Sequence, residues 1–143
     1  MRWFIGGLLL LPTLAVGGCK GDRKTGVNVP MYPEAVFLRT GRKPIGDCSN
    51  VFFQHYTAVQ DGSVLGKWYT KKLEEDPVED WMMPKALPNP EDGTAVFRTE
   101  NMGPGIDPKP VDCKKPARAV VVSSSKSGGE IQVFENVPNT PAK

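Results

Sequence analysis

The side chains of this chain that are most able to do chemistry are few and far apart. The 143 residues include one histidine, His55, and three cysteines, at positions 19, 48 and 113. A catalytic dyad, a triad or a metal site needs several such groups together, and the sequence near His55 offers none. A covalent haem site needs a Cys-x-x-Cys-His pattern, and neither Cys48 nor Cys113 belongs to one. We therefore expect His55 to be a structural residue within a strand.

Two short motifs also lack the residues that their chemistry would require. The serines at 123–125 are not set in the Gly-x-Ser-x-Gly turn that exposes a nucleophile. The segment Gly103-Pro104-Gly105 lacks the Lys and Ser/Thr of a phosphate-binding loop. The sequence therefore predicts no enzyme, no catalytic residue, no metal site and no cofactor-binding residue.

A dense acidic stretch is followed at once by a short apolar one. A calcium loop would need its oxygen ligands at defined offsets, and that order is missing here. The acids fit either a solvated surface or a site for a partner's basic surface. The apolar stretch fits either the core or a docking surface, because Trp and Met are favoured at interfaces. The candidate partner surface consists of Glu74, Glu75, Asp76, Glu79, Asp80, Trp81, Met82 and Met83.

The first residues have the pattern of an export signal. Met1 and Arg2 form a short positive start, and residues 3–16 form an uncharged, mostly apolar run. A membrane-spanning helix needs about 18 or more apolar residues. The apolar region of a secretory signal is about 7–15 residues long, which this run matches.

The segment Val16-Gly17-Gly18-Cys19 resembles the lipobox of bacterial lipoprotein precursors. In that family a diacylglycerol is attached to the cysteine and the signal is cleaved before it. The resemblance implies a signal peptide at 1–18 and a covalent lipid on Cys19, which would be the only attached group. It also implies attachment to a membrane on its exported side, periplasmic or cell-surface, without deciding between an inner and an outer membrane. An uncleaved signal anchor and a buried hairpin of the fold are the alternatives.

Assigning Cys19 to lipid leaves Cys48 and Cys113 as an even pair in an oxidising compartment. We predict that these two residues form a disulfide. Two free thiols remain the alternative, and a metal pair would lack further soft ligands nearby.

Composition and charge narrow the remaining choices. The chain has a formal net charge of +2, which gives no argument for a nucleic-acid partner. It has 15 glycines and 14 prolines, which indicates a loop-rich fold. We expect a lipidated tether at 19–29, one globular domain at 30–136, which is long enough for its own core, and a disordered tail at 137–143.

Only one segment has the apolar period of a helix. Leu65, Trp68, Tyr69 and Leu73 lie on one stripe of residues 64–75, and Pro77 ends the segment. Strands are expected at 35–39, 51–59, 94–99, 117–123 and 130–136, with 51–59 central and the last two forming a hairpin. Loops are expected at 40–47, 84–92 and 101–115, and a short turn at 78–83.

The predicted fold class is therefore α+β, a small antiparallel sheet with one main helix on one face. The segment Val29-Pro30-Met31-Tyr32-Pro33 is similar to the start of the domain in small exported lipoproteins of the envelope, with Glu34 in place of their Gly. That resemblance implies the same fold class and no activity. The function we expect is that of an accessory or scaffolding subunit that docks on a membrane protein complex. The alternative is a module that binds a small ligand or a cell-wall glycan in a groove between sheet and loops.

Overall fold

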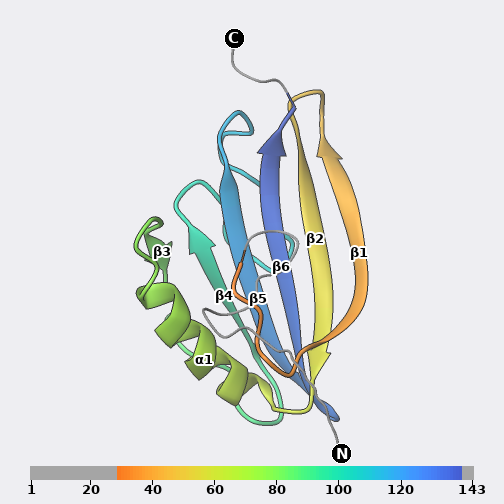
Figure 1. Ribbon diagram of the computed structural model, residues 1–143, viewed down its shortest axis with the longest axis vertical. Helices are drawn as coiled ribbons and strands as arrows, with labels where there is room; N and C mark the ends of the chain where they lie inside the picture. The colour runs from red at the N-terminus through yellow and green to blue at the C-terminus, as the bar shows by residue number, and fades with distance from the viewer. Residues whose placement is uncertain (1–28, 140–143) are drawn as a thin grey trace, which may run out of the picture.

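The computed structural model describes residues 29–139. These residues form one six-stranded sheet with the order β1-β2-β6-β5-β4-β3, in which every pair of neighbours is antiparallel (Figure 1). The elements are β1 (Val36–Ile45), β2 (Ser49–Ala58), α1 (Gly62–Glu74), β3 (Trp81–Met82), β4 (Thr94–Thr99), β5 (Ala117–Ser125) and β6 (Gly128–Pro138).

The predicted α+β class is wrong, because the structure is mostly β. In residues 29–139 the one helix has 13 residues, whereas β1, β2, β5 and β6 have between 9 and 11 each. The largest single error is the loop expected at 40–47, most of which continues β1. Gly41 and Pro44 are poor strand formers. However, β1 is an edge strand, where proline is tolerated because an N–H missing from the outer side breaks no hydrogen bond between strands.

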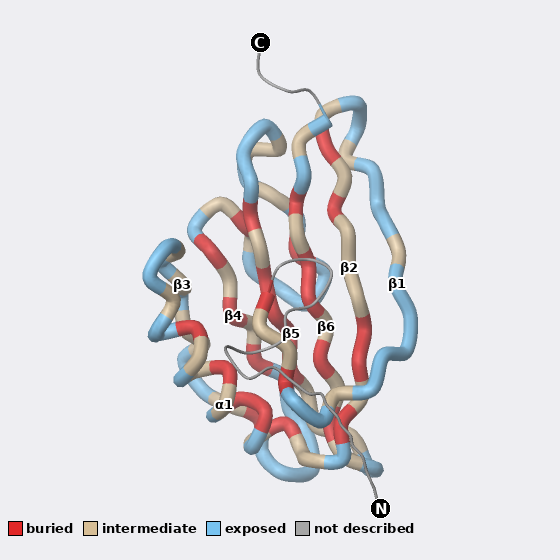
Figure 2. The backbone as a smooth tube through the Cα atoms, in the orientation of Figure 1, coloured by how far each residue is buried: buried red, intermediate tan, exposed pale blue. Residues whose placement is uncertain are grey.

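Both faces of the sheet are covered, by different parts of the chain (Figures 1 and 2). On the first face, α1 packs against β5 and β6, and Val29 and Tyr32 complete the core beside it. On the second face, a smaller core gathers around Phe134 and Met102. Apolar side chains on both faces explain the unbroken apolar runs at 51–53 in β2 and 119–122 in β5.

The helix follows the expected stripe closely. Leu65, Tyr69 and Leu73 are buried, and Trp68 stands edge-on to Tyr69 with ring centroids 4.8 Å apart. The helix begins two residues earlier than expected, because the Asp61 carboxylate accepts hydrogen bonds from the backbone N–H of residues 63 and 64.

The ends of the predicted domain differ slightly from those observed. Val29, expected in the tether, is fully buried in the first core. β6 extends through Pro138, two residues into the expected tail. The expected signal peptide, Cys19 and most of the tether lie outside the described residues. Within residues 29–139, no helix is both long and apolar enough to span a membrane.

The predicted disulfide between Cys48 and Cys113 is present, with the two Cα atoms 5.9 Å apart. It ties the β1–β2 turn to residues 100–116, which we call the disulfide loop. Asn136 of β6 donates hydrogen bonds to the backbone oxygens of Cys113 and Lys115, at 3.2 and 2.9 Å. Asn101 closes the loop on itself by bonding the backbone N–H and oxygen of Asp112, both at 2.9 Å. The loop is therefore held over the second face at several points.

Candidate functional site

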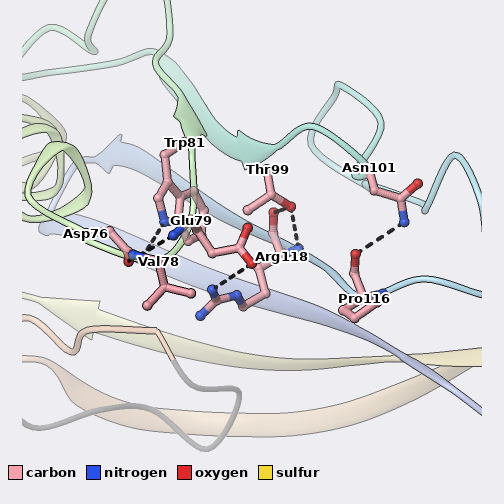
Figure 3. Close-up of polar contacts among 8 residues, drawn as sticks. All are labelled: Asp76, Val78, Glu79, Trp81, Thr99, Asn101, Pro116 and Arg118. Carbon is pink, nitrogen blue, oxygen red and sulfur yellow. Dashed lines mark hydrogen bonds and ion pairs between the residues drawn. The ribbon is translucent and has the colours of Figure 1, made fainter.

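Asp76 organises the segment that carries Trp81 (Figure 3). One carboxylate oxygen accepts from the backbone N–H of Val78 and Glu79, at 2.8 and 3.1 Å. The other accepts from the Trp81 indole N–H at 2.9 Å. Partial burial raises the pKa of Asp76, but these hydrogen bonds outweigh it and lower the pKa overall. Asp76 therefore acts as a structural acceptor for its own segment.

Trp81 and Glu79 are also engaged within the chain. The Arg118 guanidinium of β5 lies 5.4 Å from the centroid of the Trp81 ring, a cation–π distance. The same guanidinium lies 3.5 Å from a carboxylate oxygen of Glu79. Trp81 is half-buried against the first core, as is Met83. This part of the sequence-predicted surface is thus directed inward.

The rest of the predicted surface faces outward. Glu74, Glu75 and Asp80 are exposed, and Met82 is 44% exposed. An open hollow of about 560 Å³ brings Asp80 and Glu79 near two further acids, Glu100 and Asp112. Within residues 29–139, no group of three or more His, Cys, Asp or Glu side chains is arranged to hold a metal ion. The predicted surface therefore divides into a structural half and an exposed acidic half.

His55 lies in the middle of β2 and is 8% exposed. Its Nε2 is 3.0 Å from a carboxylate oxygen of Glu130 on β6, while its Nδ1 is buried with no hydrogen-bond partner. The sequence did not indicate this partner, because only the pairing of β2 with β6 brings positions 55 and 130 together. A pair that joins adjacent strands agrees with a structural role.

A hollow of about 240 Å³ lies on the second face at the margin of the disulfide loop, and we call it the second-face hollow. Phe53 and Phe134 line it, with ring centroids 6.1 Å apart. Two β1 cations, Arg39 and Lys43, also line it. Lys43 is bound to both carboxylate oxygens of Asp107 in the loop, at 2.9 and 3.0 Å. The remaining lining residues are Val51, Ile106, Pro108 and Gln132.

β1 forms one edge of the sheet and is the most exposed strand of the structure (Figure 2). Val36, Phe37 and Leu38 are 63%, 53% and 54% exposed, an unusual run of apolar side chains for a surface. The register with β2 shifts between Phe37 and Arg39, which marks a bulge at Leu38. The strand carries three cations and no acid.

Sequence reasoning missed both the β1 edge and the second-face hollow. Its strand prediction stopped at Arg39, so Lys43 was assigned to a loop. The one available signal was the apolar triplet at 36–38, whose residues cannot all face one side of a strand. The hollow joins four separate segments and has no local signature.

Comparison of the chain with protein-family models, with curated proteins and with solved structures finds no match.

Proposed function

We propose that this chain is a lipid-anchored, exported and non-enzymatic envelope protein, an accessory subunit that docks a membrane partner on its β1 edge. The observation that carries the proposal is the β1 strand itself. It is ten residues long, and no further strand of the described chain pairs with its outer side.

An edge strand of this kind is a template for another strand. Its outward backbone groups can form main-chain hydrogen bonds with an extended partner, and its side chains can supply specificity. Proteins usually protect such edges with lysine, proline and bulges. β1 has Lys43 and Pro44 at one end and a bulge at Leu38, yet Val36, Phe37 and Leu38 remain exposed. Partial protection is expected of an edge strand that must not pair with other copies of the same protein but must still accept a partner strand.

The disulfide supports the exported location on which the proposal depends. Disulfides persist in oxidising compartments and are rare in the cytosol. The lipid on Cys19 rests on the resemblance of residues 16–19 to a lipobox. A lipid anchor would hold the domain at the membrane. The effective concentration of the domain near a partner in the same membrane would then be high, which favours docking.

A module for a small ligand is the second candidate, and the aromatic second-face hollow favours it. Pockets for small ligands are usually about 300–1,000 Å³. At about 240 Å³ the second-face hollow is smaller. Its size suits one side chain of a partner better than a whole ligand.

The anchor is tested by the mass of the protein extracted from membranes. We expect a chain that begins at Cys19 and carries a diacylglycerol, with or without a further acyl group on its amine. The Cys19→Ser variant should lose both the lipid mass and the attachment to membranes. An unlipidated chain that still begins at Met1 would overturn the anchor.

Docking is tested by placing a photo-crosslinking amino acid at Leu38 in the full chain within its native membranes. We expect one discrete adduct, which the Val36→Asp variant removes. Position 111 is the matched control, because Val111 is 75% exposed and lies in the disulfide loop. Position 82 tests the surface predicted from the sequence. An adduct at 82 with none at 38 would overturn docking on β1.

A further inference from the structure

The second-face hollow lies beside the β1 edge, because alternate side chains of β1 point to the second face and two of them line the hollow. Arg39, Gly41 and Lys43 pair with His55, Phe53 and Val51 of β2, so they share the second face. A partner strand added outside β1 would place every other side chain on this same face. Those side chains would lie next to the second-face hollow.

Gly41 allows the Phe53 ring, which lines the second-face hollow, to reach the β1 edge. A Cβ atom at this position would lie 2.5 Å from the Cζ atom of Phe53, so the Phe53 ring occupies the space where a β1 side chain would otherwise stand. A long apolar side chain arriving at the edge opposite Gly41 would therefore meet the Phe53 ring, and beyond it Phe134.

Arg39 is the cation of this site whose charge is not matched within the described chain. Lys43 is neutralised by Asp107 at 2.9 Å. Among residues 29–139, by contrast, no carboxylate lies within ion-pair distance of Arg39, whose guanidinium stands 5.4 Å from the centroid of the Phe53 ring. A guanidinium held beside an aromatic ring can bind a carboxylate through two parallel hydrogen bonds.

A second copy of this chain fits the edge poorly. Antiparallel pairing of two β1 strands keeps the second faces of both copies on one side, so a pair centred on Gly41 would set Arg39 of one copy opposite Lys43 of the other. Like charges directly opposite each other destabilise a strand pair. The three cations of β1 therefore favour a partner strand with acidic residues, which β1 itself lacks.

We infer that β1 accepts an extended, acidic segment of a partner protein, with a carboxylate against Arg39 and an apolar side chain two residues away in the second-face hollow. This inference rests on the proposed docking at β1 and names the chemistry of the partner. For a partner strand that runs antiparallel to β1, like every other pair in this sheet, the recognised pattern is a large apolar residue, any residue, and then an acidic residue, because only residues two apart share a face of a strand.

The test uses the full lipidated protein in mild detergent and a fluorescent, end-capped peptide, Thr-Thr-Leu-Thr-Glu-Thr-Thr. Two control peptides have the same length. One replaces Glu with Gln, and the other, Thr-Thr-Thr-Leu-Glu-Thr-Thr, places Glu and Leu on opposite faces. We expect each control peptide to bind about tenfold more weakly, because a charge-assisted hydrogen bond or a buried apolar side chain is lost.

The matched protein variants are Arg39→Glu and Arg42→Glu. Both make the same charge change on the same exposed strand, but Arg42 pairs with Phe52 and lies on the other face. We expect Arg39→Glu to weaken binding of the Glu peptide by about tenfold or more and to favour a peptide with Lys in place of Glu. Arg42→Glu should change the affinity less than about threefold, because exposed charges that do not touch the ligand act weakly. The Arg39→Gln variant gives the same loss without a reversed charge.

Equal binding of the Glu and Gln peptides would overturn the inference. So would an equal loss of affinity for the Glu peptide in the Arg39→Glu and Arg42→Glu variants. So would equal binding of the peptide with Glu and Leu on opposite faces. The crosslink at position 38 separates this failure from failure of the docking itself. A crosslink at 38 with no preference for the acidic peptide leaves docking in place and removes the acidic partner.

Discussion

Removing the Cys48–Cys113 disulfide should cost this protein a large part of its stability. The change is the double substitution Cys48→Ser and Cys113→Ser, which leaves no free thiol at the site. The two residues are 65 positions apart in the chain. The chain-entropy model for a loop of this length gives a loss of about 4 kcal/mol at 25 °C. The free energy of unfolding of a native domain is about 5–15 kcal/mol, so the variant would be only marginally stable.

The native fold should survive the substitution in outline. Asn136 still donates to the backbone oxygens of residues 113 and 115, and Met102 of the disulfide loop remains fully buried in the second core. Most of the loss therefore comes from the freedom that the unfolded chain gains. We expect the near-ultraviolet circular dichroism of the folded variant to resemble that of the parent protein.

Urea unfolding in mild detergent measures the loss. With a slope of about 2 kcal/mol per molar urea, the midpoint should fall by about 2 M. The matched control is the parent protein with reductant, whose free energy of unfolding should fall by the same amount. Reductant should not change the free energy of unfolding of the double variant. A loss below about 1 kcal/mol would refute the reasoning, since restriction of a long loop would then contribute little.

Three further substitutions test individual contacts. Asp76→Asn should destabilise the protein by about 1–2 kcal/mol at pH 7, since the charged acceptor of three hydrogen bonds is lost. The pKa of Asp76 is lowered on folding from its usual 3.8, so its contribution is present above pH 3.8 and disappears as the pH falls through the folded pKa. The gap between the two proteins in urea unfolding should therefore narrow from pH 5 to pH 3, and a constant gap would contradict this. Asn136→Ala should cost about 1–3 kcal/mol in the same assay, because the backbone oxygen of Cys113 loses its donor and that of Lys115 keeps only Asn101; no loss would mean that water replaces the amide. Gly128→Ala should cost about 2 kcal/mol or more, since its φ is +142° and the new Cβ would lie 2.2 Å from the backbone oxygen of Ala58. Gly105→Ala is its control, with φ +104° but no atom within 4 Å, and equal losses would show that backbone strain alone decides.

Local signals in the sequence determined several elements of this fold. The stripe of Leu65, Tyr69 and Leu73 predicted the helix because a 3.6-residue period is a property of the segment alone. The glycines at 128 and 129, between two β-rich runs, predicted the β5–β6 hairpin, which pairs over residues 117–136. The expected strand at 94–99 is β4 without change. The pairing of Cys48 with Cys113 followed from assigning the third cysteine to lipid, and the disulfide is confirmed.

The tertiary structure alone decided the fold class and the candidate site. Residues 40–45 have weak strand propensity and become a strand only because β2 offers a long partner, and strand propensity depends strongly on such context. The order of the strands places β1 at an edge; Lys43 and Pro44 are compatible with that position, but they do not by themselves make residues 40–45 a strand. Within residues 29–139, the same pairing leaves Arg39 without a carboxylate while the disulfide loop brings Asp107 to Lys43. Those partners are separated by up to 64 residues, so their contact depends on the packing of the whole chain.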